Sequence, residues 1–240
     1  MSVRSDVLEW GRERVRVGPW RSDGQLAILT PTSEGPPPSP QFLRRCLDEL
    51  LSAGYRGVVT AALTPPEQAP FLAVGFHEHE RLRLLSHNLD HLPPAPDAPL
   101  RRAHEADRPA VLRVDAVAFR PFWQLDEWGL QDALSATPVA RFRVVVDTQP
   151  ERSERVAGYA ICGRTQRRGY VQRLAVDPAY RGRGWGQALT LDGLRWMRRR
   201  GVERAVVNTQ LDNDAAYALY LRLGFREERW GLAVLRQDFA

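Results

Sequence analysis

The chain of 240 residues is 43% hydrophobic and 26% charged, a balance typical of a folded globular protein and unlike that of a disordered one. No uncharged apolar stretch approaches the roughly 18 residues of a membrane span, and Asp6 and Glu9 stand where a secretory signal needs an apolar segment. The two cysteines, Cys46 and Cys162, exclude a disulfide framework and a cysteine-rich zinc module. We therefore expect a cytoplasmic protein that does not associate with a membrane.

The positive charge lies mainly in the second part of the chain. All 34 cationic side chains are arginine, and residues 1–99 hold 10 of them against 12 acidic residues. Residues 100–240 hold 24 arginines against 17 acidic residues, a net charge of +7, so we expect an anionic ligand to bind there. Because lysine is absent, the arginine content indicates biased residue usage, and we do not expect a nucleic-acid partner.

Residues 1–97 are predicted to form a small α/β module. A helix begins at Ser39 and Pro40, a capping residue followed by proline, carries apolar residues at every third or fourth position, and ends at Gly54. The other expected elements are strands at 14–17, 25–29, 57–63 and 81–85 and a short helix at 66–74. A proline-rich stretch at 91–99 coincides with the change in charge, so we place a boundary between domains 1–97 and 98–240.

Residues 98–240 are predicted to contain helices and strands in an order that favours antiparallel pairing. The expected helices span 108–119, 125–134, the segment from the loop at 181–186 to Arg200, and 213–223. The expected strands span 141–147, 156–163, 170–176, 204–210 and 232–235. Three of these strands follow one another without a helix between them. The fold class is therefore α/β, with a mixed, mostly antiparallel sheet flanked by helices and not a repeated β–α–β array.

A glycine-rich loop at 181–186 follows a predicted strand and directly precedes a helix. Glycines let backbone N–H groups approach a phosphate, and the helix start adds free N–H groups and a favourable dipole. Arg181 and Arg183 add charge-assisted donors, so the loop suits a pyrophosphate. The alternative is a glycine turn without a ligand. A Walker loop is excluded because no Gly-Lys-Ser/Thr follows, and the strand at 206–210 lacks the acidic residue of a dinucleotide-binding fold.

A second pattern follows the next strand, and its members are Asn213, Ala216, Leu219, Tyr220, Gly224 and Phe225. Loop and pattern together resemble the GNAT superfamily of N-acetyltransferases, whose signature is matched by Arg181, Gly184 and Gly186. The resemblance covers about residues 100–240. It implies a GNAT fold and an acetyl-CoA-dependent N-acetyltransferase, without a metal, that moves an acetyl group directly to a primary amine of a protein, a peptide or a small molecule.

The resemblance also implies a role for individual residues. The pyrophosphate would lie on the loop and the pantetheine along the preceding strand, whose N–H groups would polarise the thioester carbonyl. Tyr220 would protonate the departing CoA thiolate. The cofactor-binding residues implied in this way are Leu174, Ala175, Val176, Arg181, Gly182, Arg183, Gly184, Trp185, Gly186, Gln187 and Asn213. Two alternatives stay open, because Asn213 could serve only as a helix cap and Tyr220 only as a core residue.

The sequence departs from the family in one respect. Many members carry a glutamate on the strand before the loop as the base for the amine, whereas this chain has Tyr170, Gln172 and Arg173 there. Asp126, Glu127 or a water relay could take its place. A lysine with a pKa near 10.4 needs a base more than an α-amine with a pKa near 7.7–8.0 does, so we favour an α-amine or another weakly basic amine. A CoA-binding regulatory or nucleic-acid-associated protein without turnover is the alternative.

Four aromatic residues fall where this family builds its substrate cleft, namely Phe119, Phe122, Trp123 and Trp128. They could line an acceptor pocket, but aromatic side chains more often pack in a core, which is the interpretation we favour.

The two parts of the chain repeat one another at an offset of 147 residues. Residues 54–59 align with 201–206 and, after a two-residue gap, 72–76 align with 221–225. Three prolines then fall on the glycine-rich loop, Glu34 on Arg181 and Phe71 on Tyr220. Proline has no N–H to give a phosphate, and phenylalanine has no proton to give a thiolate. We therefore predict a partial, degenerate GNAT-like module in residues 1–97, in a plan similar to tandem GNAT proteins such as mycothiol synthase.

Overall fold

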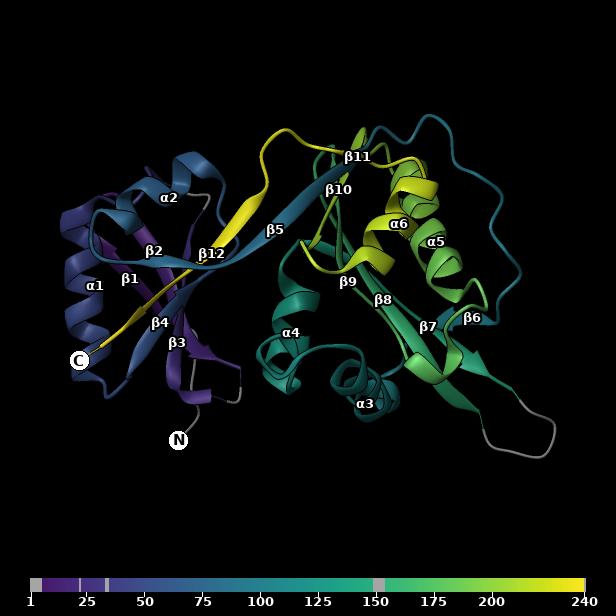
Figure 1. Cartoon of the computed structure of the whole chain (residues 1–240), viewed down its shortest axis with the longest axis horizontal. Coiled ribbons are helices and arrows are strands. Elements are labelled where there is room, and N and C mark those ends of the chain that lie inside the picture. The colour runs from purple at the N-terminus through teal and green to yellow at the C-terminus, as the bar shows by residue number, and fades with distance from the viewer. Residues whose placement is uncertain (1–5, 22, 33–34, 149–153, 240) are drawn as a thin grey trace. The chain divides into compact units, whose positions relative to one another are not determined.

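Figure 1 shows the computed structural model, which describes residues 6–21, 23–32, 35–148 and 154–239. The chain forms two compact units. Unit 1 comprises Met1–Leu84, Gln210–Asp212 and Glu228–Ala240, and unit 2 comprises Leu85–Thr209 and Asn213–Glu227. Across the described ranges, no helix has both the length and the apolar character needed to span a membrane.

Unit 1 contains a mixed sheet in which, among the strands described, β3 and β4 form the one parallel pair. Its strand order is β1-β2-β3-β4-β12-β5, and β3 pairs with β4 in parallel from Leu26↔Gly57 to Leu29↔Thr60. The strands are β1 (Asp6–Trp10), β2 (Glu13–Trp20), β3 (Asp23–Pro31), β4 (Gly57–Thr60), β12 (Leu232–Asp238) and the first part of β5 (His77–His87). The helices are α1 (Pro40–Ser52) and α2 (Pro65–Leu72).

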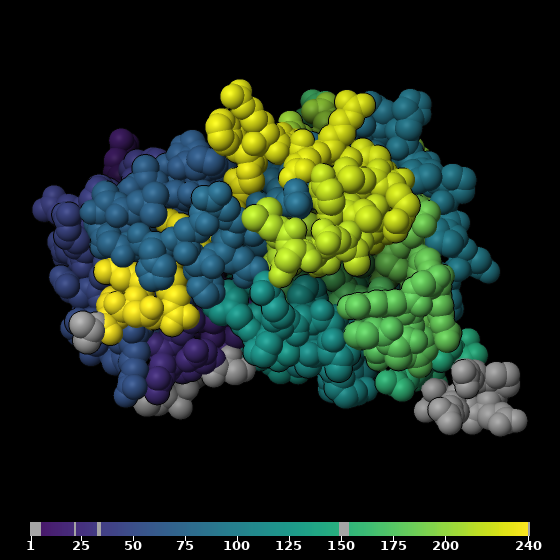
Figure 2. All heavy atoms as spheres, in the orientation of Figure 1, coloured from purple at the N-terminus to yellow at the C-terminus, as the bar shows by residue number. Residues whose placement is uncertain are grey.

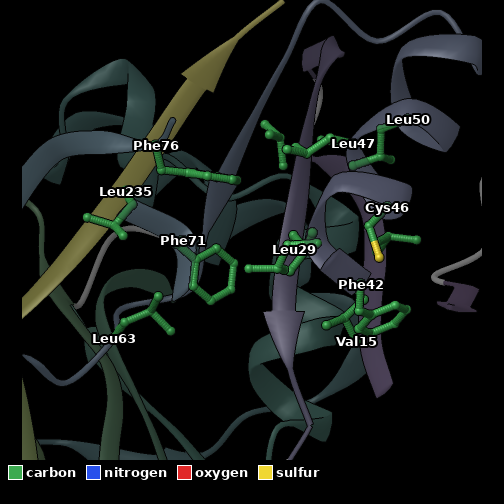
Figure 3. Packing of buried hydrophobic residues seen from close by; sticks show 14 of the residues in the cluster. Val15, Leu29, Phe42, Cys46, Leu47, Leu50, Leu63, Phe71, Phe76 and Leu235 are labelled. Carbon is green, nitrogen blue, oxygen red and sulfur yellow. The ribbon is translucent and has the colours of Figure 1, made fainter. Parts of the chain in front are cut away.

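The core of unit 1 forms on the apolar face of α1, which begins where the sequence predicts. Ser39 Oγ accepts the N–H of Phe42 at 3.2 Å, and Pro40 occupies the first turn. Side chains from the sheet, α1 and α2 pack together, with Phe71 against Phe76 at 5.3 Å between ring centroids. Figure 3 shows the labelled members Val15, Leu29, Phe42, Cys46, Leu47, Leu50, Leu63, Phe71, Phe76 and Leu235.

The strands of unit 2 follow the order β5-β10-β9-β8-β7-β6, and β11 pairs with β5. These strands are β6 (Leu100–Arg102), β7 (Val139–Asp147), β8 (Arg155–Thr165), β9 (Arg168–Val176), β10 (Arg204–Gln210), β11 (Arg226–Glu227) and the end of β5. The neighbouring pairs β6–β7, β7–β8 and β8–β9 are antiparallel, and the pair β9–β10 is parallel. The α-helices are α3 (Arg108–Ala118), α4 (Glu127–Ser135), α5 (Trp185–Arg199) and α6 (Asp214–Arg222), and the short 3₁₀ turns are η1 (Glu105–Asp107), η2 (Pro121–Trp123) and η3 (Pro178–Tyr180).

Helices cover both faces of the unit 2 sheet. Since successive side chains of a strand point to opposite faces, neighbouring residues of one strand pack against different helices. On β7, Val144 and Val146 pack with α3 and α4, whereas Val145 packs with α5 on the opposite face. The predicted α/β class with a mostly antiparallel sheet is therefore confirmed. The short strands β1, β6 and β11 were not predicted, and β5 is longer than expected.

The compact units divide at a different place from the predicted boundary near residue 97. Residues 88–97 pack on unit 2, where Leu89 is buried and Arg195 donates to the carbonyl of Pro93 at 3.0 Å. The C-terminal strand β12 instead lies in unit 1, between β4 and β5. Unit 1 thus takes β12 from the second part of the chain, and unit 2 takes the end of β5 and residues 88–97 from the first part. The domains 1–97 and 98–240 remain our proposal for the two repeated modules.

The predicted repeat is visible in the backbone of the two units. Each has a parallel pair of strands joined through a helix, followed by a shorter helix and a further strand. The glycines that end α1 and α5, Gly54 and Gly201, have φ of +90° and +73°. Those that follow α2 and α6, Gly75 and Gly224, have φ of +101° and +92°. Glycine suits such left-handed helix ends, which explains why these residues recur.

Candidate active site

The parallel strands β9 and β10 of unit 2 separate partway along their length. Their pairing runs only from Arg204↔Arg168 to Val206↔Tyr170, although β9 continues to Val176. On its other side, β9 stays paired with β8 as far as Val176. Within the described ranges, the edge of β9 after Tyr170 therefore has main-chain groups without a pairing partner on β10. Main-chain groups left unpaired in a sheet are available to a ligand.

A β-bulge lies at the point where the two strands separate. Ile161 pairs with Arg173 and Cys162 with Val171, so Gln172 has no partner on β8. A bulge of this kind re-aims the neighbouring side chains, and bulges are common beside active sites. This bulge was not predicted from the sequence. The available indication was Gly163 within an apolar strand, where an added Cβ would lie 2.7 Å from Gln172 Oε1.

The glycine-rich loop has the backbone of an anion-binding helix start. Gly182 and Gly184 adopt φ of +80° and +76°, which favours glycine. The first hydrogen bond into α5 joins Ala188 N to Gly184 O at 2.9 Å. The N–H groups of Trp185, Gly186 and Gln187 therefore have no acceptor inside the helix. Such N–H groups, with the helix dipole, suit a phosphate.

The side chains of the loop are of two kinds, exposed arginines and a buried tryptophan. Arg183 lies over the rings of Tyr180 and Trp185, with its guanidinium carbon 5.0 and 5.3 Å from their centroids. These two rings stack at 5.4 Å. Trp185 is buried, so only its main chain can face a ligand. Arg181 and Arg183 are exposed.

The three predicted residues of β9 also point their side chains into the protein. Leu174 packs beside α5, Ala175 is buried in the cluster that includes α3, and Val176 is partly buried near Trp185. A ligand between β9 and β10 would therefore meet the main chain of these residues, which is what polarising a carbonyl requires.

Tyr220 and Asn213 both lie on α6 or at its start. Tyr220 is only 4% exposed and packs against Phe225, with 5.5 Å between ring centroids. Burial raises the pKa of its hydroxyl above the usual value near 10, so the side chain keeps its proton at neutral pH. Asn213 Oδ1 accepts the N–H of Ala216 at 3.2 Å, so the helix-cap role is confirmed. The cofactor contact of Asn213 and the catalytic role of Tyr220 stay predictions.

A fully buried carboxylate lies beneath β9. Asp115 on α3 accepts hydrogen bonds from Arg173 Nε at 2.8 Å, Arg173 Nη2 at 2.9 Å, Leu125 N at 2.6 Å and the hydroxyl of Tyr159. Four donors saturate a carboxylate, so Asp115 cannot serve as the base for an amine. Asp115 was not among the residues predicted from the sequence. Its burial could have been predicted, because Asp115 lies on the same helical face as the apolar Val111 and Val114.

The two carboxylates predicted as base candidates, Asp126 and Glu127, are also engaged. Asp126 caps α4 by accepting the N–H of Gly129 at 2.6 Å. Glu127 is exposed and lies 3.7 Å from Arg108 Nη1. In the described part of the chain, no group of three or more His, Cys, Asp or Glu residues could hold a metal.

The aromatic residues near α3 and α4 are distributed between core and surface. Phe119 packs in the core with Arg173 above its ring, and Phe122 and Trp123 are half-buried and 5.1 Å apart. Trp128 is 51% exposed, so the expectation of core packing is wrong for this residue. It lies on the first turn of α4, outside the helical face that carries the buried Leu130. The teal surface in Figure 2 belongs to this α3–α4 region.

The corresponding helix start in unit 1 is filled by the chain itself. Both carboxylate oxygens of Glu13 accept from Ser39, one from its N–H and one from its hydroxyl at 3.1 Å. Residues 36–38 are prolines without N–H groups. Phe71, which replaces Tyr220 in the repeat, is fully buried. Glu34 lies outside the described residues. No phosphate could bind at the start of α1 without displacing Glu13.

This chain is similar in sequence to acetyltransferases. The model of the acetyltransferase (GNAT) family matches residues 108–225. A mycothiol acetyltransferase from Salinispora tropica is 32% identical over 219 residues, which cover 81% of this chain and 69% of that protein. N-alpha-acetyltransferase 30 from Schizosaccharomyces pombe is 38% identical over 95 residues, which cover 35% of this chain and 63% of that protein. A second mycothiol acetyltransferase, from Amycolatopsis mediterranei, aligns over only 20% of its own length.

Solved structures share the fold at low sequence identity. A tandem GNAT protein from the clavulanic acid biosynthesis pathway matches with a TM-score of 0.66 at 16% identity, covering 97% of this chain and 81% of that one. A GCN5-related N-acetyltransferase from Kribbella flavida matches with a TM-score of 0.61 at 14% identity, covering 98% and 90%. The match over nearly the whole chain includes both units.

Proposed function

Because the chain belongs to the acetyltransferase (GNAT) family, we propose that it is an acetyl-CoA-dependent N-acetyltransferase with its active site in residues 98–240. Residues 1–97 would be a partial GNAT-like module without an acetyl-CoA site. The observation that carries the proposal is the combination of a separated strand pair and a phosphate-binding helix start in unit 2. Acetyl-CoA would supply the activated acetyl group.

The loop would hold the pyrophosphate. The N–H groups of residues 185–187 have no acceptor within α5 and point out of its start, and the helix dipole favours negative charge there. Arg181 and Arg183, which are both exposed, would add charge-assisted hydrogen bonds. Gly182 keeps the approach open, since an added Cβ there would meet nothing within 4 Å.

The unpaired edge of β9 would act on the thioester. Main-chain N–H groups between Gln172 and Val176 are suited to polarise its carbonyl oxygen. Tyr220 would donate its proton to the departing thiolate, whose pKa is near 8.5 in free thiols. Burial raises the pKa of Tyr220, so its hydroxyl is protonated at neutral pH and is a weaker acid than a free phenol.

The acceptor would be an amine of low pKa. Asp115 is saturated, Asp126 caps a helix and Glu127 lies beside Arg108, so none of these three carboxylates is placed to deprotonate an amine. An α-amine with a pKa near 7.7–8.0 is partly unprotonated at neutral pH, whereas a lysine near 10.4 is not. The names of the relatives, N-alpha-acetyltransferase and mycothiol acetyltransferase, support a peptide α-amine or a small-molecule amine.

We also propose a cytoplasmic location without a nucleic-acid partner. Cys46 and Cys162 are both free and buried, which suits a reducing compartment.

The test is thiol release from acetyl-CoA. The acceptor panel would contain a hexapeptide with a free α-amine, the same peptide with a blocked terminus and one lysine, and glucosamine. We expect release with the free α-amine or with glucosamine and none with the blocked peptide. Binding of acetyl-CoA without release for any acceptor would favour the alternative, a CoA-binding regulatory protein.

A further inference from the structure

The ion pair between Asp115 and Arg173 joins β9 to α3 and is almost fully enclosed. The side chains are 0% and 11% exposed, and two parallel hydrogen bonds of 2.8 and 2.9 Å connect them. Replacing such a pair by well-packed apolar residues often leaves stability unchanged or higher. A contribution to stability is therefore a weak explanation for its presence, and its other contacts indicate what it does.

Both members of the pair also hold the main chain of residues 119–125, which connects α3 to α4. Arg173 Nη2 donates to the carbonyl of Trp123 at 2.5 Å, and Asp115 Oδ1 accepts the N–H of Leu125 at 2.6 Å. The guanidinium carbon of Arg173 lies 3.6 Å from the ring centroid of Phe119. The beginning, middle and end of this segment are thus each in contact with the pair.

The other end of the connection is the part of β9 that matters for the proposed chemistry. Arg173 directly follows the bulged Gln172 and lies beyond Tyr170, where pairing with β10 ends. The ion pair therefore sets the distance between segment 119–125 and the strand edge on which the thioester would lie. The loop at 181–186 has separate contacts, since Trp185 stacks on Tyr180 and Arg183 lies over both rings.

We propose that Asp115 and Arg173 are positioning residues for the amine acceptor, which hold segment 119–125 against the acyl-bearing edge of β9. This inference rests on the proposed acetyltransferase function. Asp115 would thus position the segment that binds the acceptor and would not act as a base. Loosening the pair should weaken binding of the acceptor and leave binding of acetyl-CoA unchanged.

The variant Asp115→Asn tests this inference, because it removes the charge and one acceptor oxygen and keeps the shape. The matched control is Asp192→Asn, which breaks a similar pair between Arg141 and Asp192 with bonds of 2.7 and 2.9 Å. That pair joins β7 to α5 and does not touch segment 119–125. We expect Asp115→Asn to raise KM for the most active panel amine at least tenfold, with Kd for acetyl-CoA by calorimetry within twofold. Asp192→Asn should leave both constants within twofold.

Two further measurements keep the inference testable if the variant is unstable or if no panel amine reacts. Arg173→Lys keeps the cation and loses the forked geometry, so it should raise KM by less than Asp115→Asn does. Hydrogen exchange needs no acceptor. In Asp115→Asn the amides of 119–125 should exchange at least tenfold faster, while those of 185–187 stay unchanged.

The possible outcomes separate the two proposals. An active wild-type enzyme with an unchanged acceptor KM in Asp115→Asn would overturn the positioning role, and so would an equal rise in Asp192→Asn. An inactive wild type contradicts the proposed function, and in that case unchanged exchange of 119–125 in Asp115→Asn overturns the positioning role independently. A wild-type rate with an inflection fixed for every acceptor, replaced in Asp115→Asn by a dependence on the acceptor's own pKa, would instead reveal Asp115 as a base.

Discussion

Gly184 is the position where the loop assignment can be tested most sharply. Its φ of +76° is left-handed, and an added Cβ would lie 3.2 Å from Pro96 Cγ. A non-glycine residue in this conformation costs about 1–2 kcal/mol, which lowers Tm by roughly 2–8 °C for a chain of this size. Gly184→Asp also places a carboxylate beside the N–H groups that would hold the pyrophosphate, so we expect this variant to lose acetyl-CoA binding.

The assay is thermal unfolding with and without acetyl-CoA. A ligand at ten to one hundred times its Kd adds about 1.4–2.7 kcal/mol, or roughly 3–11 °C, to the wild type. Gly201→Asp is the matched control, because Gly201 ends α5 with φ of +73° and has open space around it. We expect both variants to start from a lower Tm, with the ligand-induced rise kept in Gly201→Asp and lost in Gly184→Asp. A full ligand-induced rise in Gly184→Asp would refute the loop assignment.

Three further predictions follow from the same geometry. Tyr220→Phe keeps the packing against Phe225 and removes only the proton, so turnover should fall roughly 10²–10⁴-fold with an unchanged Kd for acetyl-CoA; full activity would return Tyr220 to a packing role. The rate should rise with pH along the free-amine fraction of the acceptor and should not fall near pH 10, because burial raises the pKa of Tyr220 and the proton is lost only above that pKa; an inflection fixed at pH 6–7 for every acceptor would reveal an enzyme base. Calorimetric titration should give one acetyl-CoA per chain, because Glu13 occupies the helix start of unit 1 and residues 36–38 are prolines without N–H groups; two sites of similar affinity would contradict that interpretation.

The elements that could be predicted from the sequence are those set by local interactions. Ser39 and Pro40 mark the start of α1, and positive-φ glycines end α1 and α5, because capping and left-handed turns depend on a few adjacent residues. The glycine-rich loop was predictable for the same reason. Its backbone conformation is required by Gly182 and Gly184 themselves.

The parts that the sequence could not supply depend on residues far apart in the chain. The insertion of β12 between β4 and β5 pairs Arg236 with Val59 and with His77, and no periodicity within β12 specifies its neighbours. The bulge at Gln172 is a property of the pair β8–β9 and not of either strand alone. Asp115 and Arg173 are likewise 58 residues apart, so an acid on a helix could not be assigned to a partner on a strand.

The proposed acetyltransferase activity is tested most directly by thiol release from acetyl-CoA with the free-amine hexapeptide and glucosamine, compared between the wild type and Tyr220→Phe. We expect release with at least one of the two acceptors, none with the terminally blocked lysine peptide, and a fall of about 10²–10⁴-fold in Tyr220→Phe. Wild-type protein that binds acetyl-CoA but releases no thiol with either amine would contradict it.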